Sequence, residues 1–111
     1  MFDITNNIIT LTRGDYAEAD VSLSYANGEP YVLSEGETLT LTVKRKTTDF
    51  TPIFQKVLKQ GDELVFEFLP EDTKDLDFGT YKYDVEFKTA DGKPDTIITP
   101  HDFIVDEEVT Q

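Results

Sequence analysis

The sequence predicts an all-β fold, an antiparallel sandwich of about seven strands with one short helical turn. Three observations support this prediction. Apolar and polar residues alternate along several stretches, which is typical of strands with one buried and one exposed face. Turn-forming residues such as Asn-Gly and Asp-Gly separate these stretches at intervals of roughly 8–12 residues. No long stretch of the chain follows the spacing of an amphipathic helix.

Residues 80–88 show the clearest alternation in the chain. Charged and hydroxyl side chains alternate there with four large inward-facing residues, which are Tyr81, Tyr83, Val85 and Phe87. The preceding stretch, near residues 71–76, reads as a single helical turn that Pro70 leads in and Gly79 closes. A turn that enters a strand at Gly-x-Tyr-x-Tyr resembles the corner of immunoglobulin-like sandwiches, in which a tyrosine hydroxyl bonds to nearby backbone. The predicted sandwich is therefore immunoglobulin-like.

The other strands follow the same pattern. They are predicted in chain order at residues 8–12, 16–25, 38–46, 52–60, 63–69 and 94–105, the last interrupted near Pro100. Their predicted inward residues include Ala17, Ala19, Val21, Leu23, Tyr25, Leu39, Leu41, Val43, Leu64, Phe66 and Phe68. Residues 52–60 fit a strand or a short helix almost equally, and the strands on both sides favour a strand. Residues 106–111 are expected to be a frayed acidic tail.

Length and composition predict one domain that spans residues 1–111. Apolar residues make up 38% of the chain and aromatic residues 12%, which suffices for a single core. The absence of cysteine excludes a disulfide-stapled module and a thiolate zinc site. The sequence has no apolar run of membrane-spanning length and no signal peptide, so we expect a soluble protein with no membrane partner.

The net charge of −13 argues against nucleic acid and anionic membranes as partners, because an acidic surface repels phosphate. One segment, residues 44–60, has the opposite charge, with five basic residues against one acid. These basic residues are Lys44, Arg45, Lys46, Lys56 and Lys59. One interpretation is that cations on exposed strands deter aggregation. The other is that they form an interface with an acidic neighbour or with a second copy.

No catalytic, cofactor-binding or metal site is predicted. The single histidine, His101, has no adjacent nucleophile pattern, and there is no glycine-rich phosphate loop. The acids Asp72, Asp75 and Asp77 share a loop, but their spacing does not match a calcium-binding loop and favours stabilisation of a helical turn instead. The triplet at residues 13–15, Arg-Gly-Asp, is explained by a turn. We therefore expect a protein that is not an enzyme and needs no cofactor.

Four stretches of the sequence are considered together, at residues 9–15, 20–24, 37–44, and the block of 70–73 followed by 79–84. They resemble the amino-terminal domain of the upper baseplate protein of phages and prophages of Gram-positive bacteria. The resemblance implies a non-enzymatic building block of a tail or baseplate, made in the host cytoplasm and assembled into the virion. It also implies partners that are other phage structural subunits or copies of the same chain, in a homo-oligomeric assembly.

A different class of function is also considered, an immunoglobulin-like binding module that recognises carbohydrate or a protein at a bacterial surface. Such modules present exposed aromatic side chains as stacking platforms. The aromatic residues that fall in predicted loops here are Tyr31, Phe50 and Phe78. Their exposure would separate this hypothesis from the structural one.

Overall fold

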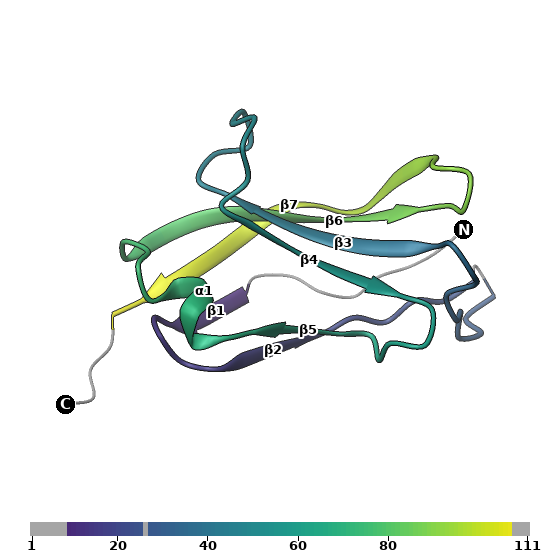
Figure 1. Ribbon diagram of the computed structural model, residues 1–111, viewed down its shortest axis with the longest axis horizontal. Helices are drawn as coiled ribbons and strands as arrows, with labels where there is room; N and C mark the ends of the chain where they lie inside the picture. The colour runs from purple at the N-terminus through teal and green to yellow at the C-terminus, as the bar shows by residue number, and fades with distance from the viewer. Residues whose placement is uncertain (1–8, 26, 108–111) are drawn as a thin grey trace.

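The computed structural model describes residues 9–25 and 27–107, which form two packed β-sheets (Figure 1). The elements are β1 (Ile9–Thr12), β2 (Ala17–Asp20), β3 (Thr38–Lys44), β4 (Phe54–Lys59), β5 (Val65–Phe68), α1 (Pro70–Thr73), β6 (Gly79–Lys88) and β7 (Pro94–Asp106). The larger sheet has the order β1-β7-β6-β3-β4, and β2 and β5 form the smaller sheet. The prediction of an all-β sandwich with one short helical turn is confirmed, and residues 52–60 contain a strand.

The strand order is that of an immunoglobulin-like sandwich. Strands β7, β6, β3 and β4 are neighbours in one sheet and β2 and β5 form the other, which matches the G-F-C-C′ order opposite B and E. β1 joins the larger sheet in parallel to β7, with Ile9 opposite Phe103. The expectation of a wholly antiparallel sandwich is therefore wrong at this edge. Its direction is not set by a hairpin, because the chain between β1 and β7 passes through both layers.

The facing sides of the two sheets form the core. Leu39, Leu41 and Val43 of β3 are completely buried, and Phe66 and Phe68 approach them from β5. Aromatic rings meet edge to face in the core, both between the layers and within the larger sheet, because this geometry suits their quadrupoles. The ring centroids of Phe103 and Phe68 are 5.3 Å apart, and those of Phe103 and Phe54 are 5.9 Å apart. The predicted inward faces of these strands are confirmed.

The predicted tyrosine corner is present where the chain enters β6. The hydroxyl of Tyr81 donates a hydrogen bond of 2.7 Å to the carbonyl oxygen of Asp77, four residues earlier. Tyr81 is otherwise buried in the core, so this bond satisfies its polar group at the end of the sandwich. The motif was recognisable from sequence because the bond is local.

Three boundaries differ from the sequence predictions. The second strand ends at Asp20, and Tyr25 is 45% exposed, because a turn begins there with the N–H of Gly28 donating to Tyr25 oxygen. The last strand continues through Pro100, because two register shifts against β6 place extra residues in β7 and accommodate a residue without an N–H. Asp106 belongs to β7 and accepts a hydrogen bond from the N–H of Arg13. The remainder of the predicted frayed tail, residues 108–111, lies outside the described residues.

Four acidic residues stabilise turns of the backbone. In four places an acidic residue donates its backbone N–H to the carbonyl oxygen three residues earlier, while its carboxylate accepts that residue's N–H. The pairs are Ser34 with Glu37, Lys46 with Asp49, Lys59 with Asp62, and Leu69 with Asp72. This reciprocal pattern satisfies backbone donors and acceptors where no strand partner is available.

Two glycines provide a matched test of packing beside the β6–β7 turn. Gly36 and Gly28 both have positive φ, but a Cβ at Gly36 would lie 2.8 Å from the Cβ of Ala90, whereas Gly28 has nothing within 4 Å. A positive φ disfavours alanine by about 1 kcal/mol, and overpacking adds about 1 kcal/mol more. We therefore expect Gly36→Ala to lower the free energy of unfolding by about 2 kcal/mol and Gly28→Ala by about 1 kcal/mol. Urea denaturation measures both, and equal losses would show that Ala90 moves aside.

Candidate interaction surface

The loop between β3 and β4, residues 45–53, projects from the larger sheet and is called here the basic hairpin (Figure 1). Its conformation is held by backbone contacts. The N–H of Ile53 donates to the oxygen of Val43 at 2.7 Å, and the N–H of Lys46 donates to Asp49 Oδ2 at 3.2 Å. Phe50, in the same loop, is 99% exposed. A large apolar side chain is thus exposed to solvent on a loop whose conformation is held by hydrogen bonds.

A hollow of about 390 Å³ lies between the basic hairpin and the outer face of the larger sheet. Outward-facing residues of β3, β4 and β6 line it together with two hairpin residues. The lining residues are Thr40, Thr42, Lys44, Phe50, Pro52, Gln55, Val57, Asp84, Glu86 and Lys88. Apolar and charged groups of both signs therefore meet in one depression, which is typical of a protein-binding surface.

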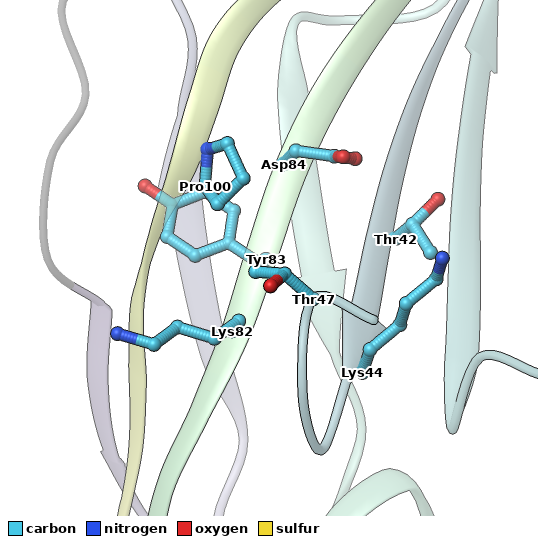
Figure 2. A pocket seen from close by; sticks show the side chains of 7 residues that line it. All are labelled: Thr42, Lys44, Thr47, Lys82, Tyr83, Asp84 and Pro100. Carbon is cyan, nitrogen blue, oxygen red and sulfur yellow. The ribbon is translucent and has the colours of Figure 1, made fainter. Parts of the chain in front are cut away.

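A second, smaller hollow of about 50 Å³ also lies on this face of the sheet (Figure 2). Lys44 and Asp84 extend into this region from the neighbouring strands β3 and β6, and Pro100 lies beside Tyr83. Burial raises the pKa of Asp84, and the nearby positive charge of Lys44 partly opposes this shift. The volume suits ordered water rather than an organic ligand.

The five predicted basic residues do not form one patch. Lys44, Arg45 and Lys46 lie together at the base of the basic hairpin, and Arg45 also stacks over the Tyr81 ring at 5.2 Å. Lys59 is exposed at the opposite end of β4. Lys56 points inward, and its Nζ lies 2.6 Å from Asp72 Oδ2. Three of the five residues thus lie at the hairpin, where Arg45 also contacts Tyr81 and Asp77, whereas Lys56 serves the fold.

The inward orientation of Lys56 was not foreseen from the sequence. Strand β4 alternates in exposure, with Phe54, Lys56 and Leu58 on the inner side and the residues between them exposed. The same alternation in the sequence places a lysine among apolar residues, and a lysine in that position usually has an acidic partner. The partner could not be identified, because it lies in α1, beyond the next strand.

Two of the acids in α1 and in the loop that follows it contact cations. Asp72 pairs with Lys56, and Asp77 lies 3.6 Å from the guanidinium of Arg45. Within the described residues, no group of three or more His, Cys, Asp or Glu side chains is placed to hold a metal ion. His101, the single histidine, packs its ring at 6.4 Å from that of Tyr83.

The Arg-Gly-Asp triplet is used internally. The Arg13 guanidinium stacks at 4.1 Å over the Phe78 ring and donates to the oxygen of Leu76 at 3.4 Å. The N–H of Gly14 donates at 2.9 Å to the hydroxyl of Thr73, which is fully buried. These contacts fasten the turn before β2 to the segment around α1, as the interpretation of a structural turn expects.

The aromatic residues predicted in loops have different surroundings. Phe50 is almost fully exposed, whereas Phe78 is covered on one face by Arg13. Tyr31 packs edge-on against Tyr25 at 5.1 Å and against Phe87 at 6.2 Å. Of these three loop aromatics, Phe50 is the one that offers a whole side chain to a partner.

The raised pKa values of two tyrosines predict a loss of stability at alkaline pH. Burial raises the pKa of Tyr83 from 10.0 to about 12, and burial together with a hydrogen bond to the Glu37 carboxylate raises the pKa of Tyr31 to about 12. Between pH 10 and 12 the unfolded chain has released protons that the native state still holds, so the free energy of unfolding falls as pH rises. Below pH 10 this contribution is fully present. We expect Tyr83→Phe to make the decline shallower in urea denaturation at pH 10, 11 and 12, and an unchanged slope would contradict this assignment.

Comparisons with known proteins do not supply a family. No model of a known protein family and no curated protein matches this sequence. In the part of the chain that the structure describes, no helix is long and apolar enough to cross a membrane.

Proposed function

We propose that this protein is a non-enzymatic structural protein of a phage or prophage tail or baseplate, and that it acts through protein–protein contacts. The observation that carries the proposal is the basic hairpin. Phe50 is 99% exposed there and lies on the same loop as Arg45 and Lys46. Aromatic and arginine side chains are the residues that most often anchor protein interfaces.

The construction of the domain supports an assembly role. The large side chains on the inner faces of the sheets are buried in the core, and several acidic residues stabilise turns or pair with cations. What remains at the surface is a projecting hairpin, a hollowed sheet face and exposed strand edges, which are features of association. The resemblance of four sequence stretches to a baseplate protein domain points to the kind of assembly. The partners are other structural subunits or copies of this chain.

The test is whether the protein is part of a particle. Phage particles induced from the bacterial strain that encodes this chain are purified on a density gradient and analysed by quantitative mass spectrometry. We expect the protein in several copies per particle, and immunogold labelling at the tail end. Deletion of its coding sequence should yield particles with incomplete tails. Absence of the protein from purified particles, with the major capsid protein detected, would refute the proposal.

The exposed ring of Phe50 also favours a second candidate, a module that binds carbohydrate, because a free aromatic face can stack on a sugar. A glycan array separates the two functions. Binding to a defined glycan that is abolished by Phe50→Ala would favour the carbohydrate-binding module. An array without hits, together with detection in particles, would favour the structural role.

A further inference from the structure

We propose that the basic hairpin of one copy docks into a hollow between β4 and β5 of a second copy, so that copies join head to tail. The inference rests on the proposed function, because it names the partner of the hairpin and the surface that receives it. It depends on two surfaces of one chain that complement each other in charge and in polarity.

The receiving hollow lies where two open sheet edges face each other. In the described part of the chain, β4 pairs only with β3 and β5 only with β2, so each strand has an edge without a strand partner. Two adjoining depressions of about 410 and 230 Å³ follow this seam and share Leu58, Val65 and Glu67. The partly buried Leu58 and Val65 give the seam an apolar floor. We call these two depressions together the seam hollow.

The rim of the seam hollow is mostly acidic, and the one cation in its lining, Lys56, is paired with Asp72. It carries the carboxylates of Glu18, Asp62, Glu63 and Glu67. Glu18 and Glu67 lie directly opposite each other in the β2–β5 pair, and the hydroxyl of Tyr16 lies 3.0 Å and 2.5 Å from their Oε2 atoms. This hydroxyl has a single proton and cannot donate to both carboxylates at once. Like charges opposite each other across strands repel, so a cation from outside would relieve the pair.

The basic hairpin carries positive charge that complements the carboxylates of the rim. Residues 44–46 are the one run of three consecutive cations in the sequence, and Phe50 follows four residues later. The single acid of the loop, Asp49, accepts the N–H of Lys46 and so helps to shape the turn. An exposed ring on a loop that also carries Arg45 and Lys46 matches an apolar floor rimmed by carboxylates, and such complementarity orients partners and excludes wrong ones.

The two surfaces cannot meet within one chain. The basic hairpin ends at residue 53 and Leu58 lies five residues further along the extended β4, so the strand separates them by about 16 Å. The hairpin therefore meets the seam hollow of another copy, and in the head-to-tail arrangement that we propose the two copies present different surfaces. Repetition of such a contact produces a ring or a filament, which suits a tail or baseplate built from many copies.

Sedimentation equilibrium at low salt measures the contact directly. We expect the wild-type protein to self-associate, and Phe50→Ala to weaken association about 30-fold, as for an interface anchor. Raising the salt concentration should weaken the wild-type contact, because charges at the rim are screened. Val32→Ala is the matched control, since Val32 is a 76% exposed apolar residue outside both surfaces, and it should leave association unchanged.

A mixing experiment tests the head-to-tail arrangement. Phe50→Ala removes the exposed ring of the hairpin but keeps the seam hollow. Glu63→Lys with Glu67→Lys reverses two charges of the rim but keeps the hairpin. Each variant alone should stay monomeric, and an equimolar mixture should form dimers and nothing larger. A symmetric contact between two hairpins would give no dimers in the mixture, and a reciprocal pair of contacts would limit the wild-type protein itself to dimers. Circular dichroism confirms that the variants fold, and Glu63→Lys alone replaces the double variant if that one does not.

The outcomes separate this inference from the proposed function. A wild-type protein that stays monomeric to about 1 mM, which corresponds to binding weaker than about −4 kcal/mol, overturns the head-to-tail contact. So does self-association that Phe50→Ala leaves intact. If the protein is nevertheless found in particles, the structural role stands with a different partner. If the copies join as described but are absent from particles, the contact stands and the tail role fails.

Discussion

Replacing Phe103 with alanine is expected to lower the free energy of unfolding by about 3–5 kcal/mol, the largest effect of any single substitution considered. Phe103 is completely buried in β7, and its ring meets those of Phe54, Phe68 and Tyr83 at centroid distances of 5.9, 5.3 and 6.4 Å. Alanine would leave a cavity bounded by three aromatic rings, which relax only partially into the space. Edge-to-face contacts would be lost in addition to the buried area.

Urea denaturation monitored by tyrosine fluorescence or circular dichroism measures this loss. A single domain of this size has a total stability of about 5–15 kcal/mol, so this loss is a large fraction of the total. Phe103→Leu is the matched control, because it keeps most of the volume, and it should reduce the loss to about 1 kcal/mol. A loss of only about 1 kcal/mol for the alanine variant would show that the sheets close over the cavity.

Replacing Asp72 with alanine is expected to lower the free energy of unfolding by about 2–4 kcal/mol. The Oδ2 atom of Asp72 accepts the N–H of Leu69 at 2.7 Å at the start of α1, and it also lies 2.6 Å from Nζ of Lys56 in β4. The Asp72 side chain is 15% exposed and that of Lys56 is 23% exposed, so solvent screens the pair only in part. Alanine would remove the turn contact and leave the lysine without its anion in a mostly buried position.

The converse substitution distinguishes the two roles of Asp72. Lys56→Met keeps the length and apolar stem of the side chain and leaves Asp72 bonded to the N–H of Leu69. We expect a loss of about 1 kcal/mol or less, because an apolar group can replace one half of a partly buried ion pair when the other half keeps a donor. Chemical denaturation of both variants measures the difference. Equal losses would show that the ion pair, rather than the turn, carries the contribution.

The basic segment shows which parts of the candidate site can be predicted from the sequence. Charge alone located residues 44–60, and the structure places Lys44, Arg45 and Lys46 together at a projecting hairpin. Charge could not show that Lys56 turns inward, since its partner Asp72 lies in a different element. The acidic seam hollow was also invisible in the sequence, because its rim combines residues of β2, β5 and the turn between β4 and β5.

The sequence by itself determined which residues of most strands face inward and where the main turns fall. Tyr81, Tyr83, Val85 and Phe87 are buried as their alternation predicts, and the Tyr81 hydroxyl bonds four residues back. These properties are local, because the two-residue period of a strand and the geometry of a turn depend on neighbouring residues alone. Only the tertiary structure decided the parallel pairing of β1 with β7, the passage of β7 through Pro100, and the open seam between β4 and β5. Those features join segments that are distant in the chain, and the pattern within one strand carries no information about which partner it will meet.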